Sequence, residues 1–352
     1  MFTNPEELQD NTVNISCSSP VPSIVSNSSV TDPRLPALQT VFDPVGLGQV
    51  LNQVVPAEWG KAKDLKIQLL QYHRASRCTL SICWQTTTGS RELIAKVYAA
   101  DRSDVYRAMK QITESGFGAE AEFAVPRPLA YVPEQNLLLL EKVPGVLATE
   151  VFLTGNETER VHAAERCALW LANFHRRGPR LGPVFTITTD LLESWAQRLA
   201  KRAEQVLAKA VLLSTGLQNC TRKNGTIQPS ACHGTYCHYQ IVLNDNQTVT
   251  LDWDGHCLAD PTLDVARFMI ILQQLALTSQ ASLNALNATC QVFYSTYLAA
   301  SRFHIAQQLP FYKAALYLKH AKDFAKRDAV RIELVETMLD EGLRILTEEV
   351  EH

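Results

Sequence analysis

The sequence predicts an α+β protein of two lobes, in which strands come first and helices follow. Strand-like runs at residues 67–72, 78–84 and 92–98 are separated by polar turns, which indicates an antiparallel meander. Apolar residues at helical spacing dominate from residues 158–176 onward. A hairpin-like insertion near residues 231–252 interrupts the helices and carries the polar residues of a candidate site. We therefore expect a small antiparallel-sheet N-lobe and a larger, mainly helical C-lobe.

Length and charge narrow the class of protein. With 352 residues, 46% of them hydrophobic, the chain can fill the cores of two lobes. Lys and Arg number 33 and Asp and Glu 36, a net charge of −3, so no overall basic field favours nucleic acid or an anionic membrane as a partner. No apolar run approaches the ~20 residues of a membrane span, and Met1–Asp10 lacks a signal-peptide pattern. We expect a cytoplasmic protein whose nine cysteines are reduced.

Three segments are predicted along the chain. Residues 1–40 are rich in Asn, Ser, Thr and Pro, which predicts a flexible tail because burial cannot offset the entropy of ordering them. Residues 41–143 form the predicted N-lobe, and residues 144–352 form the predicted C-lobe. Asp43 and Pro44 supply a helix N-cap and a first-turn proline ahead of an apolar stripe, so a short helix should open the N-lobe.

Local patterns predict the remaining elements of the lobes. Residues 104–112 carry one apolar face and should form a helix that stops near Gly116. The proline-rich run 125–131 suits an edge strand, and 137–140 is a fully apolar strand. Residues 191–213 are predicted to form one long helix.

One loop carries most of the functional information. Cys232–Leu243 joins a tight His-Gly turn to an apolar strand, and a second apolar strand ends at Asp252, within the segment Leu251–Gly255. Kinase-like enzymes bring a base and a Mg²⁺ ligand to one ATP in this way. From about residue 43 onward the chain resembles the aminoglycoside phosphotransferase and choline kinase-like family. The family loop is H-G-D-x-x-x-x-N, and its following D-P-x-x-D motif matches Asp260–Asp264 without a gap.

The resemblance implies a protein-kinase-like fold, ATP and Mg²⁺ as cofactors, and a small-molecule hydroxyl as the substrate. It places Lys96 on the ATP phosphates. It places Asp252 on Mg²⁺ together with Gln240, which stands where the family usually has Asn, since this hard cation prefers oxygen ligands. It gives Asp264 a structural role, holding the loop through its backbone amides. Taken alone, Lys96 also fits a solvated lysine on the open face of a strand, and Asp252 an ordinary turn former.

Thr235 stands where the family has its catalytic Asp. That Asp orients and deprotonates the attacking hydroxyl, a contribution of about 10²–10⁴ in rate, and a threonine hydroxyl is too weak a base to replace it. Three outcomes remain open: slow catalysis through metal and positioning, a substitute base, or nucleotide binding without turnover. The candidate substitute bases are His233, His238 and Asp254. In extended backbone Asp254 would share a face with Asp252.

Other parts of the nucleotide site are marked by position in the chain. The carboxylate partner of Lys96 should come from the helix that follows it, where Glu114 lies at the helix end and Asp104 fits better as an N-cap. Glu141 and Val143 fall at the hinge, whose backbone reads the adenine edge in the family.

The turn at residues 72–77 lacks the G-x-G-x-x-G pattern of a phosphate-binding loop. A phosphate cradle there must use backbone N–H groups or the side chains of Arg74 and Arg77. The competing interpretation is a plain surface hairpin turn.

We interpret the chain as an ATP-dependent phosphotransferase acting on a small-molecule hydroxyl. The alternative is a pseudokinase that binds nucleotide or metabolite without turnover. A zinc or haem site is a rival interpretation, although its ligands lack the usual paired C-x₂₋₄-C spacing. It would draw on Cys232, His233, Cys237, His238, His256 and Cys257.

Overall fold

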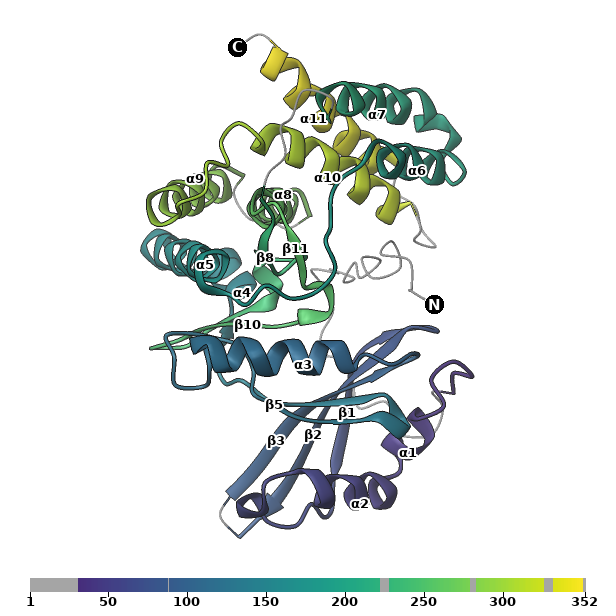
Figure 1. Cartoon of the computed structure of the whole chain (residues 1–352), viewed down its shortest axis with the longest axis vertical. Coiled ribbons are helices and arrows are strands. Elements are labelled where there is room, and N and C mark those ends of the chain that lie inside the picture. Colours follow the sequence, from purple (N-terminus) through teal and green to yellow (C-terminus); the bar gives the residue numbers. More distant parts are fainter. Residues whose placement is uncertain (1–30, 88, 222–227, 279–282, 326–331, 351–352) are drawn as a thin grey trace. The chain divides into compact units, whose positions relative to one another are not determined.

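A computed structural model describes residues 31–87, 89–221, 228–278, 283–325 and 332–350 (Figure 1). It divides into two compact units. The sheet unit consists of the described residues up to Val146 together with Val242–Trp253, and the helical unit consists of Leu147–Ile241 and the described residues from Asp254 onward. After the short helices at its start, the chain forms the main sheet first and most of its helices afterwards, so the predicted α+β class is confirmed. Most of the predicted tail, residues 1–30, lies outside the described residues.

A five-stranded antiparallel sheet in the order β1-β2-β3-β6-β5 forms the framework of the sheet unit. The first three strands are the predicted meander. The last strand lies at the sheet edge, where its first-position proline costs no ladder hydrogen bond. The bounds are β1 Lys66–His73, β2 Arg77–Thr86, β3 Gly89–Tyr98, β5 Pro128–Val132 and β6 Leu137–Glu141.

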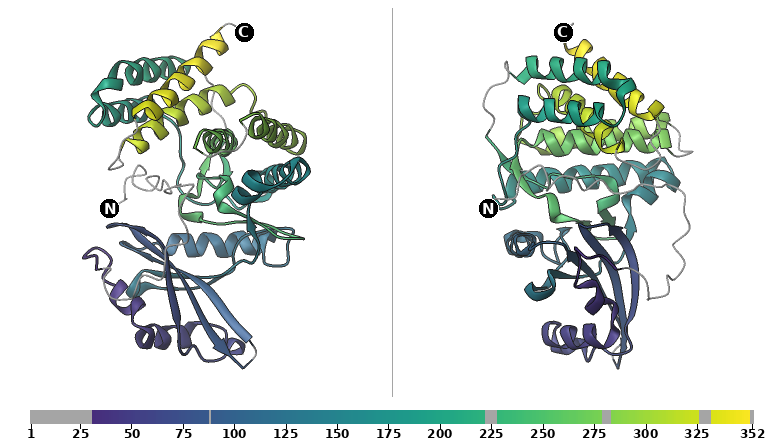
Figure 2. Two further views of the ribbon diagram at one scale, coloured as in Figure 1. Left: turned by 180° about the vertical axis from the view of Figure 1, so that it is seen from behind. Right: turned by 90° about the vertical axis from the view of Figure 1, so that its right-hand side faces the viewer.

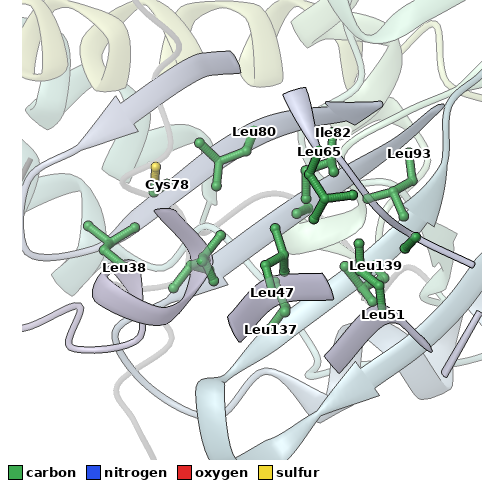
Figure 3. Packing of buried hydrophobic residues seen from close by; sticks show 14 of the residues in the cluster. Leu38, Leu47, Leu51, Leu65, Cys78, Leu80, Ile82, Leu93, Leu137 and Leu139 are labelled. Atoms are coloured by element: carbon green, nitrogen blue, oxygen red, sulfur yellow. The ribbon is translucent and has the colours of Figure 1, made fainter. Parts of the chain in front are cut away.

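Two short helices, α1 (Leu38–Phe42) and α2 (Pro44–Val54), pack on one face of this sheet (Figure 3). Asp43 caps α2, accepting hydrogen bonds from the backbone N–H groups of Val45 and Gly46 at 3.0 Å each, as predicted. The core contains Leu35 and Leu38, each only 1% exposed. Since burying a leucine contributes about 1.5–3 kcal/mol, the packed part of the chain begins before residue 41, inside the segment predicted to be a tail.

A second, small sheet of the order β4-β10-β9-β7 also belongs to this unit. Strand β10 (Thr248–Thr250) pairs in parallel with β4 (Phe123–Ala124), and Val249 packs with Ala124 and Val242. Through this pairing, Val242–Trp253, which includes Asp252, belongs to the sheet unit. The prediction instead placed every residue after 143 in the C-lobe. The other elements are α3 Ser103–Ile112, a π-helical turn Thr113–Phe117, 3₁₀ turns Ala57–Trp59 and Pro133–Gln135, β7 Val146–Leu147 and β9 Ile241–Leu243.

The helical unit consists of packed helices and a two-stranded ribbon formed by β8 and β11. Helices α10 and α11 run side by side, as do α5 and α9 (Figure 2). In the ribbon, β8 pairs with β11 in antiparallel fashion, Cys232 opposite Cys257. The bounds are α4 Ala148–Thr154, α5 Glu157–Arg177, α6 Thr189–Ala200, α7 Leu207–Thr221, β8 Ser230–Cys232, β11 Cys257–Ala259, α8 Thr262–Thr278, α9 Leu283–Ala300, α10 Leu309–Phe324 and α11 Ile332–Val350, with 3₁₀ turns Glu204–Val206, His238–Gln240 and Trp253–Gly255.

The prediction of one helix over residues 191–213 is wrong. Helix α6 ends at Ala200, and α7 begins at Leu207 after a turn in which Ala203 has φ −145°. No Gly or Pro marks the break, because its cause is tertiary: the two helices pack on each other and bury Leu199 and Leu213 completely.

Two further findings concern the whole described chain. No described helix is both long enough and apolar enough to cross a membrane. The eight described cysteines form no disulfide with one another: Cys78, Cys83, Cys167, Cys220, Cys232, Cys237, Cys257 and Cys290.

Candidate functional site

Lys96 and Arg77 lie on the same face of the five-stranded sheet. Lys96 on β3 pairs with Thr79 on β2, and Arg77 is two positions before Thr79, so the side chains of all three point the same way. The intervening residues Cys78 and Val97 point into the core under α1 and α2. The two cations therefore occupy the face of the sheet opposite to that core.

Asp252 meets both cations within the sheet unit. The Lys96 Nζ lies 2.5 Å from Asp252 Oδ1, and the Arg77 Nη2 lies 3.6 Å from Asp252 Oδ2. The Lys96 side chain is 9% exposed, so it is not the solvated lysine of the simpler interpretation. Asp252 has φ 61°, a left-handed conformation that non-glycine residues rarely adopt and that is found disproportionately at functional sites.

Neither carboxylate expected from the helix after β3 is seen to pair with Lys96. Asp104 pairs with Arg102 at 3.0 Å. Glu114 is exposed in the π-helical turn that follows α3. The carboxylate found on Lys96 is that of Asp252.

The turn between β1 and β2 is held by a residue that sequence reasoning missed. Asp32 accepts hydrogen bonds from the Ala75 backbone N–H at 2.6 Å, the Tyr72 hydroxyl at 2.8 Å and the Arg34 N–H at 2.9 Å. These bonds, that from Ala75 first, lower the pKa of the Asp32 carboxyl. Asp32 fell within the predicted tail, and no local pattern links it to a turn some 40 residues away. Arg74, on the same turn, is exposed.

The predicted hinge leaves β6 as expected. The Glu141 backbone N–H donates to the Arg127 carbonyl at 3.0 Å, and Val143 packs on the small core of Ala124 and Val242. Gly145 has φ 139°, and a Cβ there would lie 2.6 Å from the Leu243 carbonyl oxygen. This position therefore requires glycine.

In the helical unit, Asp264 on α8 holds the loop that follows β8. Its carboxylate accepts from the backbone N–H groups of His233 at 2.7 Å and Gly234 at 2.8 Å, and His175 Nε2 lies 3.2 Å away. Complete burial raises the pKa of Asp264, but hydrogen bonding to His175 and the loop outweighs it, so the pKa is lowered. The carboxylate therefore shapes the loop backbone. The sequence indicated only a histidine near the C-terminal end of a helix, because His175 lies on α5, 89 positions from Asp264.

Glycine is required at the loop turn. Gly234 has φ 78°, and a Cβ would lie 2.1 Å from the Gly255 carbonyl oxygen. Tyr236 then anchors the loop, donating its hydroxyl to the Cys167 carbonyl at 2.8 Å and stacking on Trp170.

Hydroxyl, imidazole, amide and thiol side chains form the polar part of the loop. The Thr235 Oγ1 lies 3.1 Å from His233 Nδ1, and the Gln240 amide donates to the same oxygen at 3.3 Å. The Cys237 thiol lies 3.0 Å from the Gln240 carbonyl oxygen. All four side chains are buried, so Thr235 is a hydrogen-bond junction at the position of the family's carboxylate.

The other two candidate bases have different surroundings. His238 is fully buried, its Nδ1 lies 2.7 Å from the Thr149 hydroxyl, and burial lowers its pKa to about 4. Asp254 is 3% exposed in the 3₁₀ turn Trp253–Gly255. The expectation that Asp252 and Asp254 share a face assumed extended backbone, which the left-handed Asp252 and this turn do not provide.

The rival metal site is not supported. Within the described part of the chain, the one group of three close potential ligands is His175, Cys232 and Asp264. Asp264 is already used by the loop N–H groups, and burial raises the pKa of the Cys232 thiol well above its usual value, which disfavours the thiolate that metals require.

The sheet that carries a buried lysine, followed by a helical unit with a loop held by a buried aspartate, defines the protein-kinase-like fold. A model of the phosphotransferase enzyme family matches residues 82–295, and the chain belongs to this family. No curated protein sequence gives a significant match.

Solved structures show the same fold at low identity. A choline kinase from Cryptosporidium parvum Iowa II is 9% identical, with 88% of this chain and 97% of that chain covered and a TM-score of 0.63. A thermostable mutant aminoglycoside phosphotransferase, in ternary complex with ADP and hygromycin B, is 14% identical, with 86% and 98% covered and a TM-score of 0.58. A choline kinase from Streptococcus pneumoniae is 12% identical, with 80% and 93% covered and a TM-score of 0.55.

Proposed function

We propose that this protein transfers a phosphoryl group from ATP to a hydroxyl of a small molecule. The observation that supports this most directly is the 2.5 Å contact between Lys96 and Asp252. A buried ammonium on the third strand and a carboxylate at a strand end are the charges that a magnesium nucleotide requires. Membership of the phosphotransferase enzyme family is the second support.

The proposed roles follow from the chemistry of each group. Lys96 binds phosphate oxygens, and the backbone of Glu141 and Val143 reads adenine. Asp252 and Gln240 fit Mg²⁺ as oxygen ligands, and the Gln240 carbonyl keeps acceptor capacity because it has two lone pairs and the bonded thiol is a weak donor. The ion, when bound, would neutralise charge on the transferring phosphoryl group.

A Thr235–His233 pair is proposed to replace the missing base. The acceptor hydroxyl attacks the γ-phosphorus of ATP, and ADP leaves. The proton of the acceptor hydroxyl passes to Thr235 Oγ1, while the proton of the Thr235 hydroxyl passes to His233 Nδ1, 3.1 Å away. This requires the tautomer in which Nδ1 carries no proton. His238 is the weaker candidate, because protonating it in its buried site is unfavourable.

The second candidate function is nucleotide binding without turnover. It is favoured by one observation: Thr235 replaces the carboxylate, and Gln240 and His233 already satisfy its hydroxyl. Under this function the sheet unit would bind nucleotide and the loop would be structural.

Binding and consumption of ATP test the two functions in turn. We expect Mg-ATP to raise the melting temperature, and Asp252→Ala to remove the magnesium-dependent part of that rise. Asp245→Ala is the matched control, because Asp245 is an exposed carboxylate of the same unit. An unchanged magnesium effect in Asp252→Ala would show that the metal assignment is wrong.

ATP consumption against a panel of alcohols, sugars and amino alcohols then decides turnover. Acceptor-dependent ADP release supports the phosphotransferase. Binding without consumption across the panel, unchanged by restoring the carboxylate with Thr235→Asp, supports the second function.

A further inference from the structure

We propose that Arg77 is a second phosphate-binding cation of the nucleotide site, acting with Lys96. The proposal rests on the proposed function, because it assumes that the nucleotide phosphates reach Lys96. It assigns a role that the family motifs do not give, since none of them includes a residue at the start of β2.

Position and burial distinguish Arg77 from an ordinary surface arginine. It is the first residue of β2, shares a sheet face with Lys96, and is 2% exposed. Burying a guanidinium is costly unless anionic groups compensate it, and here it faces the carboxylate that Lys96 also contacts. The two cations use different oxygens, Oδ1 for Lys96 and Oδ2 for Arg77, so neither displaces the other.

The charge of this trio suits a polyanion. Two cations share the single carboxylate of Asp252. If Asp252 turns its oxygens to a magnesium ion, both cations lose that carboxylate and can compensate phosphate oxygens instead. A planar guanidinium can bind two such oxygens at once.

Arg77 also stands where phosphate-binding groups are otherwise scarce. The β1–β2 turn has no glycine-rich loop, and the Ala75 N–H, a possible phosphate donor, is bonded to Asp32 at 2.6 Å. A side-chain cation at the end of this turn supplies the attraction that free backbone N–H groups would have provided.

The experiment compares ATP, ADP and adenosine binding by calorimetry at saturating Mg²⁺. We expect Arg77→Gln to weaken ATP and ADP binding by about 10- to 100-fold, as for loss of a charge-assisted hydrogen bond, and adenosine binding by less than about threefold. Arg77→Lys keeps the positive charge but loses the planar guanidinium, so its affinities for ATP and ADP should lie between those of the wild type and of Arg77→Gln. Arg107→Gln, which replaces an exposed arginine on α3 in the same unit, is the matched control and should leave all three affinities unchanged.

A metal-free measurement gives a readout that a structural role would not move. In EDTA, Asp252→Asn should bind ATP severalfold more tightly than the wild type, because the variant removes the negative charge of the Asp252 carboxylate from beside both cations. Adding Arg77→Gln should cancel most of that gain. If the gain persists in the double variant, Arg77 is not the phosphate ligand.

The outcomes separate this inference from the proposed function. A wild-type protein that binds neither ATP nor ADP contradicts the proposed function itself. Wild-type binding that Arg77→Gln leaves intact, or reduces equally for adenosine and ATP, overturns only the role of Arg77. If Arg77→Gln does not fold, Arg77→Lys carries the test, since it keeps a cation beside Asp252 and should still lose ATP affinity severalfold more than adenosine affinity.

Discussion

The two candidate sites of this protein use opposite chemistries. In the sheet unit, the candidate site consists of charged groups: Lys96 and Arg77 both form ion pairs with Asp252. In the helical unit, hydroxyl, imidazole, amide and thiol groups surround Thr235, and the buried Asp264 on α8 accepts hydrogen bonds from the loop backbone. Under the proposed function, this contrast assigns the attraction for the nucleotide mainly to the sheet unit and the transfer chemistry mainly to the helical unit, so mutations should separate the two.

The largest loss of stability is expected from removing the buried Asp264, whose carboxylate holds the loop backbone. Asp264→Ala removes the acceptor for two loop N–H groups and His175, and should lower the free energy of unfolding by about 3–5 kcal/mol. The urea midpoint of the helical unit measures this. Asp340→Ala, which loses only an exposed pair with Lys209, should cost less than about 1 kcal/mol. Equal losses in the two variants would mean that Asp264 does not hold the loop.

The next effect concerns the loop hydroxyl. Thr235→Asp restores the family's carboxylate and should raise the rate of acceptor phosphorylation by up to about 10²–10⁴. Thr235→Val keeps the shape but removes the hydroxyl, and should lower a wild-type rate while leaving the ATP dissociation constant unchanged. A rate that is indifferent to Val would contradict the Thr235–His233 relay.

A third test measures how the stability of the protein depends on pH through the buried His238 of the loop. His238 is neutral in the fold because burial lowers its pKa from 6.5 to about 4, whereas the unfolded chain takes up the proton near pH 6.5. Stability is therefore complete above pH 6.5 and is lost as the pH falls toward 4, by up to about 3 kcal/mol.

Melting temperatures between pH 7 and pH 4 measure this loss. His238→Asn should flatten the decline while keeping a polar partner for Thr149. The matched control is His162→Asn on the exposed side of α5, which should leave the slope as in the wild type. An unaltered slope in His238→Asn would assign the acid sensitivity to other groups.

The smallest effect asks whether the units are also separate in stability. Asn156 caps α5 through a capping box, and Asp43 caps α2. Replacing either by Ala should cost about 1 kcal/mol. Hydrogen exchange should show faster opening only in the unit that carries the change. Faster exchange in both units from either change would show one cooperative structure.

Much of the fold was predictable because its signals are local. The spacing of apolar residues, the polar turns and the helix caps were enough to predict the meander, α2 with its Asp43 cap, and α5. Motif order also anticipated that Lys96 and Asp252 would lie together and that Asp264 would hold the loop.

What could not be predicted depends on distant pairing. Arg77 is buried against Asp252 only because strand register and the β4–β10 pairing bring them together. His175 and Asp32 act on residues far along the chain, and nothing beside them in the sequence shows it. Periodicity reports which face of an element is apolar, and leaves open which element will cover it.

Asp32 has a practical consequence for anyone who shortens this protein. Trimming at the predicted lobe start, residue 41, would remove Leu35 and Leu38 from the core and take away the carboxylate that clasps the Ala75 amide. The remaining hairpin would gain a free N–H group at its tip. In the truncated protein the Ala75 N–H would be able to donate to a bound anion, which Asp32 prevents in the longer chain. The two proteins would then differ in anion binding even though every motif residue is present in both.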